Sequence, residues 1–539
     1  CLIHMGLLAE AAAAVPRGAA AAAAAAQQFT EAHGSDFTLS GISEEERRAA
    51  AVAVRAALPA LESYGVEAST ALLDLVRIIL RQPGDAIEPL LEQPAIRCYV
   101  EMASHAEALV ARQALKCLVN AAMQKHHRTL MESDALATCV ANLRQDADTE
   151  VTILSAHVAF IVVANEPEAF PVLCEACGDS PPLAGVLRLC LAVLHSSLAI
   201  AGDGAISLSS KQRAPAVTAV LKLLQIVRHN ADSQPLTSAS VAAGEHGAEG
   251  AVEPARDAQD GGAAAVTELL TELGALIARM LVMQGARREE KDIKRHVVQL
   301  MVFMEDERDW AQYGPYLLEQ GAVEPLLDML ETETAAIQGL TVVEPAWCRS
   351  HLVPLFMVLH RIATAGSLCK AIIKARIFPP HLDKVWRQRL DAEDKADAED
   401  LDEDEITRRG KEKQEARMHP IDAPLGTFRA HLIHLIVSIE EYTKRCVSEF
   451  LFELCDGDMD EYTLRVGYGN AVYMMHVKGA LAMAGLATGE GTGGRRGGPS
   501  TVGSRAAATA AASAPPRPAS ASSSSSSPQP PSPPGQEET

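Results

Sequence analysis

The sequence predicts an all-α protein in which helical repeats stack into a right-handed solenoid. Three observations lead to this prediction. Apolar residues return at helical spacing along most of the 539 residues, and aromatic residues make up only 4% of them. No β-hairpin signal and no alternation of strands with helices competes with that pattern. Because sheets depend on aromatic and β-branched residues, a chain dominated by Ala, Leu and Val favours helices.

The helical pattern begins near residue 44 and ends near residue 486. Its first clear segments, 72–80, 114–122 and 153–163, carry apolar residues at i, i+3, i+4 and i+7. They recur about every 40 residues, the period of armadillo/HEAT repeats. One helical pair cannot bury its own apolar face, so neighbouring pairs must cover each other in a line. Later segments of the same type are 186–194, 219–227, 273–283, 296–304, 322–330, 352–363 and 431–439.

Composition divides the chain into three parts: an Ala-rich disordered N-terminus at 1–43, the solenoid at 44–486, and a Gly/Ser/Pro-rich disordered tail at 487–539. Within the solenoid we expect a disordered loop at 233–262 and an acidic insertion at 391–417. The acidic run that opens the insertion is either a solvated, self-repelling segment or a docking strip for a basic partner.

Charge and cysteine usage restrict the partners and the compartment. A formal net charge of −22 argues against nucleic acid as the main partner, since phosphate binding needs an excess of Lys and Arg. The eleven cysteines lack the spacing of a disulfide framework, which indicates a reducing compartment. The apolar runs fall short of the roughly 20 residues of a membrane span, and signal-peptide features are missing. We therefore expect a cytoplasmic chain with no direct membrane insertion.

The motifs of common active sites are missing from the sequence. The CxxC at Cys174 and Cys177 has no second pair for zinc and no strand–helix context for redox chemistry. His431 and His434 stand three residues apart, but two ligands without a third more often pack in a core or face solvent. With no Walker, GxSxG or HExxH motif present, we expect neither catalytic residues nor a metal or cofactor.

A binding surface is the better prediction. In "ALKCLVNAA" a polar Asn120 interrupts an apolar run, and Lys116 and Arg112 precede it on the same helix face. Asn120 either faces a groove, where it pairs with a ligand's backbone amides, or lies in the core with its hydrogen bonds satisfied. In the preceding repeat, Arg77 and Arg81 are four residues apart and form either a solvated face or a basic rim that accepts a carboxylate.

The C-terminal repeats carry a resemblance to a known family. "KRCVSEFLFELC" (444–455), "VGYGNA" (466–471) and "KGALAMAG" (478–485) resemble the signature of the synembryn family. Members are armadillo/HEAT-repeat chaperones and guanine-nucleotide exchange factors for heterotrimeric G-protein α subunits. Further matching segments are 75–82, 114–120, 368–383 and 428–446.

The resemblance implies a partner and a mechanism. The partner is a G-protein α subunit, GDP-bound or nucleotide-free, whose carboxy-terminal helix enters the groove; GDP leaves, and GTP binding then frees the subunit. By position, Arg77, Arg81, Lys116 and Asn120 match groove positions of the family. We expect a monomer that acts without a cofactor and is recruited to the plasma membrane through its partner.

Three departures from the family pattern keep a second interpretation open. Ile226, Gln299 and Phe303 stand where later groove helices of the family carry Asn, and the acidic insertion is additional. The tail also replaces the C-terminal helices with which members embrace the α subunit. The alternative is a generic armadillo/HEAT scaffold that binds peptides without affecting nucleotide exchange.

The glycine turn within the signature, Gly467-Tyr468-Gly469-Asn470, fails as a dinucleotide fingerprint. It lacks the third small residue and follows a helix rather than a strand. We predict instead that Gly467 ends one helix in the left-handed region and that Asn470 N-caps the next helix.

Overall fold

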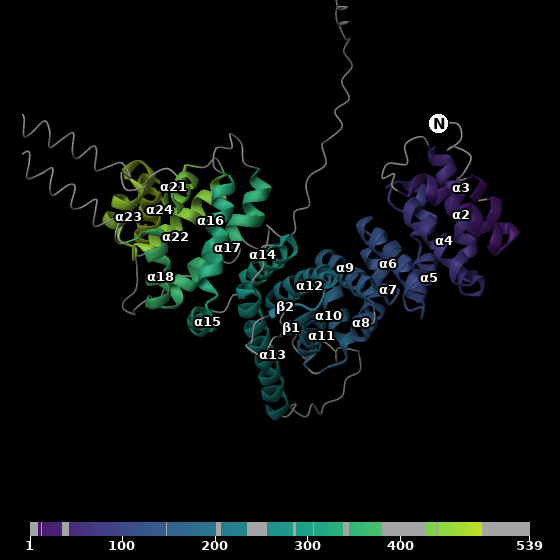
Figure 1. The fold of residues 1–539 in the computed structure, drawn as a ribbon, viewed down its shortest axis with the longest axis horizontal. Coiled ribbons are helices and arrows are strands. Elements are labelled where there is room, and N and C mark those ends of the chain that lie inside the picture. The colour runs from purple at the N-terminus through teal and green to yellow at the C-terminus, as the bar shows by residue number, and fades with distance from the viewer. Residues whose placement is uncertain are drawn as a thin grey trace, which may run out of the picture. The chain divides into compact units, whose positions relative to one another are not determined.

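The computed structural model is helical almost throughout the residues that it describes, which contain one short β-ribbon (Figure 1). The ribbon pairs β1 (Leu198–Ile200) antiparallel with β2 (Ile206–Leu208). The structure describes residues 9–11, 13–34, 42–146, 148–179, 181–200, 206–233, 256–283, 287–304, 307–337, 344–379, 426–437 and 440–487.

Eight helices form a first row in which each member packs on the next. These are α2 (Ala19–His33), α4 (Val66–Ile79), α6 (Ala108–Met123), α9 (Thr149–Asn165), α12 (Ala214–Ser233), α14 (Arg288–Val302), α17 (Pro345–Ala365) and α22 (Glu441–Leu454).

Six helices form a second row, and each of them packs on the first-row helix that follows it in the chain. They are α5 (Gln93–Ala103), α8 (Ala135–Gln145), α11 (Pro182–Ser197), α13 (Arg256–Val282), α16 (Val323–Ala336) and α21 (Phe428–Ile436). Two rows of helices that grow by sequential pairs are the architecture of a solenoid. The predicted all-α solenoid is therefore confirmed, whereas its right-handed sense stays a prediction.

The remaining helices connect or cover the rows. They are α3 (Glu44–Ala57), α7 (His127–Glu132), α10 (Ala169–Cys177), α15 (Glu307–Glu319), α18 (Ser367–Ile377), α23 (Met459–Val466) and α24 (Tyr468–Ala487), with the 3₁₀ turns η1 (Val15–Arg17), η2 (Leu58–Tyr64), η3 (Asp85–Leu90) and η4 (Lys211–Arg213).

Local sequence determines where several helices begin. Ser43 and Glu46 form a reciprocal capping box at α3, with Ser43 N–H donating to the Glu46 carboxylate at 2.9 Å. Asp148 caps α9 by accepting the Val151 amide at 2.9 Å, and Asp458 caps α23 in the same way. Between the rows, side chains such as Tyr99 and Phe356 are fully buried in one continuous apolar core.

The structure differs from the predicted boundaries at two places. Residues 1–43 were predicted to be disordered, yet α2 is a helix within that segment and packs on α4 with Phe29 fully buried. Likewise α13 begins at Arg256, inside the predicted loop 233–262. In both segments Ala-rich sequence has high helix propensity, and α2 in addition buries an apolar face. The acidic insertion 391–417 and residues 488–539 lie outside the described residues.

No single described helix has the length and hydropathy of a membrane span. Among the described helices, one bent pair reaches that length and hydropathy together, α10 with α11, and the bend between them is 71°.

Candidate functional site

The predicted binding residues lie on α4 and α6, which are neighbours in the first row. Asn120 Nδ2 donates to the Arg77 carbonyl at 2.8 Å, and Gln124 Nε2 donates to the Leu80 carbonyl at 3.1 Å. Arg81 follows Leu80, the C-cap residue of α4. The fold thus brings together residues that are about 40 positions apart in the sequence, as repeat stacking predicts.

Arg77 in the last turn of α4 and Arg81 just after its C-cap both have partners within the protein. Arg77 Nε lies 2.6 Å from Asp74 Oδ1, one turn earlier on the same helix, and the Arg77 side chain is 18% exposed. Arg81 Nη1 donates to the carbonyl of Gly34 at the end of α2, at 2.9 Å. The Arg81 side chain therefore links the C-terminal ends of α2 and α4 by a hydrogen bond.

The two cations of α6 are bound to the start of α9. Arg112 and Asp148 form a bidentate pair, with Nε to Oδ1 at 2.9 Å, and Arg112 Nη1 lies 3.5 Å from Glu150. Lys116 Nζ lies 2.8 Å from Glu150 Oε1. The guanidinium of Arg112, with the amide of Val151, holds the pKa of the Asp148 carboxyl below its usual value. This cluster of Arg112, Lys116, Asp148 and Glu150, called here the rim cluster, is balanced in charge.

Sequence reasoning identified the cations of the rim cluster but missed its acids. Asp148 and Glu150 stand in the loop and first turn before an apolar helix, where acids are ordinary capping residues. Their pairing with Arg112 and Lys116 depends on the register between α6 and α9, which packing sets. A ligand carboxylate at Arg112 and Lys116 would therefore share these cations with resident acids.

Asn120 has features of both interpretations that the sequence left open, a residue that faces a groove and a residue whose hydrogen bonds are satisfied within the protein. It is half-buried, so it is not a core residue, and its amide already donates to a backbone carbonyl. Besides Gln124, two more side-chain amides of the row do the same: Gln225 Nε2 donates to the His296 carbonyl at 3.0 Å, and Gln299 Nε2 donates to the Ser350 carbonyl at 3.1 Å. Side-chain amides thus join neighbouring first-row helices at three places along the row.

The other positions that depart from the family pattern also lie in the first row. Ile226 is half-buried and packs against the core from α12. Phe303, the C-cap residue of α14, meets the ring of His229 edge-on, with centroids 5.7 Å apart. Apolar and aromatic side chains therefore occupy this part of the row.

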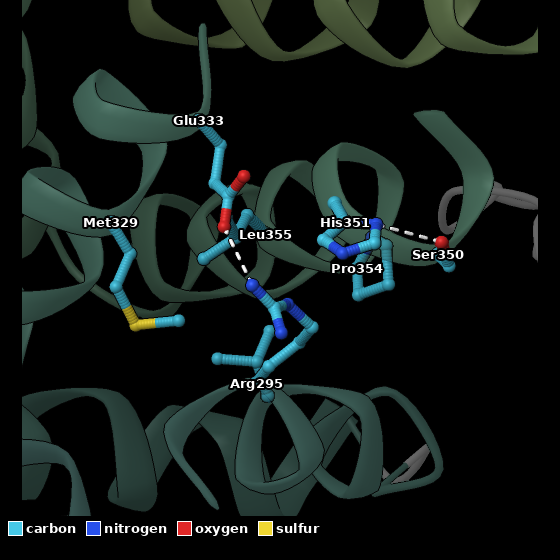
Figure 2. A pocket seen from close by; sticks show the side chains of 8 residues that line it. Arg295, Met329, Glu333, Ser350, His351, Pro354 and Leu355 are labelled. Carbon is cyan, nitrogen blue, oxygen red and sulfur yellow. Dashed lines mark hydrogen bonds and ion pairs between the residues drawn. The ribbon is translucent and has the colours of Figure 1, made fainter. Parts of the chain in front are cut away.

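A shallow pocket lies where α14, α16 and α17 meet, and Figure 2 shows its lining. Arg295 and Glu333 point toward one another across it, with Nη2 to Oε1 at 3.0 Å, and Arg295 also binds Asp292 at 2.7 Å. Ser350 and His351 form one wall, where the His351 ring stacks on Trp347. The two opposite charges of Arg295 and Glu333 are paired with each other across the pocket, and Ser350 Oγ lies 2.8 Å from His351 Nδ1.

The cysteines and histidines that the sequence offered as metal or redox candidates lack the arrangement that such chemistry requires. Cys174 and Cys177 are buried thiols, and burial raises their pKa to about 12 and about 11, which disfavours the reactive thiolate. His431 is buried whereas His434 is exposed, so the two do not share a solvent face. Among the described residues, no three His, Cys, Asp or Glu side chains are arranged to hold a metal ion.

The glycine turn is a corner between α23 and α24. Gly467 ends α23 with a positive φ of 86°, as predicted, but its ψ of 148° is not that of the predicted left-handed cap. The prediction for Asn470 is wrong: α24 begins at Tyr468, so Asn470 lies in its first turn, and its Nδ2 donates to the Val466 carbonyl at 2.7 Å. One glycine suffices to turn the chain, so the next helix starts three residues earlier than an N-cap at Asn470 would place it. Tyr468 is 45% exposed, and no atom outside the turn approaches Gly469 within 4 Å of a Cβ position.

Together, the two rows and the charged face of α4 and α6 define a helical-repeat solenoid, a class that presents binding surfaces along its repeats. The sequence matches the family described as "guanine nucleotide exchange factor synembryn" over residues 72–398 and 416–528, more than half of the chain. The chain belongs to the synembryn family. The match includes α4 from residue 72 on, the whole of α6 and the glycine turn.

Individual relatives are similar over shorter stretches. "Chaperone Ric-8A" of Xenopus laevis and that of Xenopus tropicalis are each 36% identical over 57 residues, which is 11% of this chain and 11% of either relative. Two designed armadillo repeat proteins of known structure, one in complex with the peptide (KR)4, are each 15% identical, cover 57% of this chain and 99% of their own, and have TM-scores of 0.36 and 0.34. The fold assignment rests on the helix contacts described above, not on these similarities.

Proposed function

We propose that this protein binds a heterotrimeric G-protein α subunit, serves as its folding chaperone, and promotes release of its GDP. The observation that carries the proposal is the synembryn match, which extends over the first-row helices from the second half of α4 to α22. The relatives named as chaperones support the folding role. The expected compartment is the cytoplasm, with recruitment to the plasma membrane through the partner, and the expected state is a monomer.

In this proposal the α subunit binds along the uncovered face of the first row, where Arg77, Arg112, Lys116 and Asn120 lie. Exchange without covalent chemistry requires only that the solenoid bind the nucleotide-free α subunit more tightly than the GDP-bound one. The difference between the two binding free energies then favours the conformation of the partner in which its nucleotide site is open. No residue of this chain has to touch the nucleotide.

The second candidate function is a peptide-binding scaffold that leaves nucleotide exchange unchanged. The observation that favours it is the charge balance of the rim cluster, because Asp148 and Glu150 compete with a ligand carboxylate for Arg112 and Lys116. A scaffold and an exchange factor would both form a complex, but only the exchange factor would accelerate GDP release.

The test combines complex formation with nucleotide release. The full chain is mixed with a GDP-loaded α subunit, and the rate of labelled GDP release is measured beside gel filtration of the mixture. Faster release together with a complex is the expected result. A complex without faster release supports the scaffold, and neither complex nor faster release refutes the proposal.

The location of the site is tested by a charge-matched pair of variants. Arg77→Gln with Lys116→Gln should weaken binding of the α subunit at least tenfold, about 1.4 kcal/mol, because both side chains lie on the proposed face. The control is Arg128→Gln with Arg188→Gln, two exposed arginines with the same total charge. Equal affinities of the two double variants would place the binding site elsewhere.

A further inference from the structure

The helix α24, which follows the last helix of the first row, is fixed to the protein along its inner side. Ala471 is fully buried there. Lys444 of α22 lies over the Tyr473 ring, with Nζ 4.4 Å from the ring centroid, and Lys478 Nζ lies 5.3 Å from the centroid of Phe452 of α22. These cation–π contacts, together with packing on α23, give α24 a defined inner side.

The exposed side of this region carries an apolar stripe. Leu464 of α23 is 39% exposed, and Tyr468 and Val472 of α24 are each 45% exposed. Tyr468 and Val472 share one face of α24, because residues four apart are neighbours on a helix. We call Leu464, Tyr468 and Val472 the corner stripe, since the chain turns between the first two of them.

An apolar surface is unexpected at this position, because the terminal repeats of a solenoid normally present a polar outer face to water. The first helix of the row follows that rule: Gln27 and Glu31 are exposed on α2 and share a hydrogen bond of 3.2 Å. In contrast, the 20 residues of α24 include one Lys and no Arg, Asp or Glu. An exposed apolar patch on a helix of this composition indicates that another surface covers it.

Two occupants from this protein itself are unsuitable. Residues 488–539, which follow α24, contain no Leu, Ile, Met, Phe, Tyr or Trp that could fill the stripe. A second copy would bury too little area. Large apolar side chains hold about 150–250 Å² when fully exposed, so the partly exposed corner stripe offers about 250 Å². Two copies would then bury about 500 Å², half of the roughly 1,000 Å² that a stable interface requires.

The sequence after α24 has the charge that a lipid surface attracts. Residues 488–536 contain four arginines and one acid, although the whole chain has a net charge of −22. Arginines that follow an apolar helix are attracted to anionic headgroups. Charges more than about 8 Å from a membrane are screened at physiological salt, so the acids of distant repeats oppose this attraction little.

We propose that the corner stripe binds an anionic membrane surface, with α24 parallel to the bilayer, the stripe in the headgroup region, and the arginines that follow α24 attracted to the lipid headgroups. A tyrosine suits that depth, because its ring is apolar and its hydroxyl can remain in water. Asp460 is exposed one turn before Leu464 and limits the apolar surface on α23. Such a contact adds a direct route to the membrane beside the expected recruitment through the partner, and it does not depend on the proposed function.

The direct test measures binding of the full chain to lipid vesicles without any α subunit. Phosphatidylcholine vesicles that contain about 30% phosphatidylserine are compared with vesicles of phosphatidylcholine alone, by flotation at about 0.1 M salt. The affinity for the anionic vesicles should be at least about tenfold higher. No binding to the anionic vesicles, or equal binding to both kinds, overturns the proposal.

The contribution of the stripe is tested by a matched pair of double variants. Tyr468→Gln with Val472→Gln should weaken binding to the anionic vesicles at least about tenfold, because Gln retains helix propensity but removes the apolar area. The control is Val52→Gln with Leu109→Gln, which replaces apolar residues of α3 and α6 that are 54% and 55% exposed. If the two double variants have equal affinities, the stripe is not the membrane site.

The contribution of charge is tested in the same assay. Arg495→Gln with Arg496→Gln should weaken binding about three- to tenfold, because both arginines lie within nine residues of the end of α24. Arg128→Gln with Arg188→Gln removes the same charge from exposed positions of the repeats and should have little effect. Equal losses would show that binding follows the total charge, which contradicts the proposed role of these arginines.

Hydrogen exchange of the wild type provides a test that needs no variant. The amides of residues 468–479 should exchange at least about threefold more slowly on the anionic vesicles, while those of α3 stay unchanged. Unchanged exchange in α24 would exclude the corner stripe even if the chain binds vesicles.

The α subunit is the alternative occupant of the stripe. If Tyr468→Gln with Val472→Gln binds vesicles normally but loses affinity for the α subunit, the stripe is a protein-docking surface and the membrane assignment is wrong. Because the vesicle assays contain no α subunit, failure of the proposed function would leave their results unchanged.

Discussion

Asp148 performs two tasks at the start of α9, and two substitutions separate them. Its carboxylate pairs with Arg112 of α6 and accepts the Val151 amide as the N-cap. Asp148→Ala removes the pair and the cap together. Asp148→Asn removes the charge but keeps a side chain that caps a helix as well as Asp does.

The structure allows the magnitudes to be worked out. Loss of an N-cap costs about 1 kcal/mol. A hydrogen-bonded charge pair is worth about 1.5–3 kcal/mol when it is buried, but the side chains of Arg112 and Asp148 are 30% and 22% exposed, which reduces the value to about 0.5–1 kcal/mol. Asp148→Ala should therefore lower the free energy of unfolding by about 2 kcal/mol, and Asp148→Asn by about 0.5–1 kcal/mol.

The assay is urea unfolding followed by circular dichroism, with hydrogen exchange of the α9 amides as a local probe. The Val151 amide should exchange faster in Asp148→Ala but not in Asp148→Asn. Glu107→Ala is the matched control, because Glu107 occupies the N-cap position of α6 without forming a side-chain cap. Equal losses for Ala and Asn at position 148, or unchanged exchange at Val151 in the Ala variant, would refute the reasoning.

Three further predictions follow from the same contacts. Asn142→Ala should lower the free energy of unfolding by about 2–3 kcal/mol in urea, since it leaves the buried Ala103 carbonyl and Ser155 hydroxyl without their donor; a loss below about 1 kcal/mol would contradict this. The melting temperature should fall as the pH drops below about 6.5. Burial lowers the pKa of His157, His296 and His360 in the folded protein, so the unfolded chain binds more protons in this pH range. His360→Gln should reduce the fall in melting temperature, and an unchanged fall would show that His360 does not contribute to it. Glu150→Gln should tighten binding of the α subunit about two- to fivefold by releasing Lys116, and weaker binding would show that Glu150 itself contacts the partner.

The helical class of this protein follows from the sequence because it depends on a local pattern. Apolar residues at a 3.6-residue period specify a helix with one buried face wherever they occur, as in α6 and α12. The same reasoning predicted a corner at Gly467, where a glycine is the residue best suited to a positive φ. Local signals failed at α2, whose Ala-rich sequence resembles a low-complexity tail until Phe29 is buried against α4.

The binding face was decided by tertiary structure. Sequence periodicity placed Arg112, Lys116 and Asn120 on one side of a helix, but it could not show which groups lie opposite them. Packing of α6 against α9 sets Asp148 and Glu150 beside two of those side chains. A helix pattern is a property of neighbouring residues. The pairing of charges on a surface depends instead on the register between helices that are tens of residues apart in the chain. Only close packing of the core determines that register.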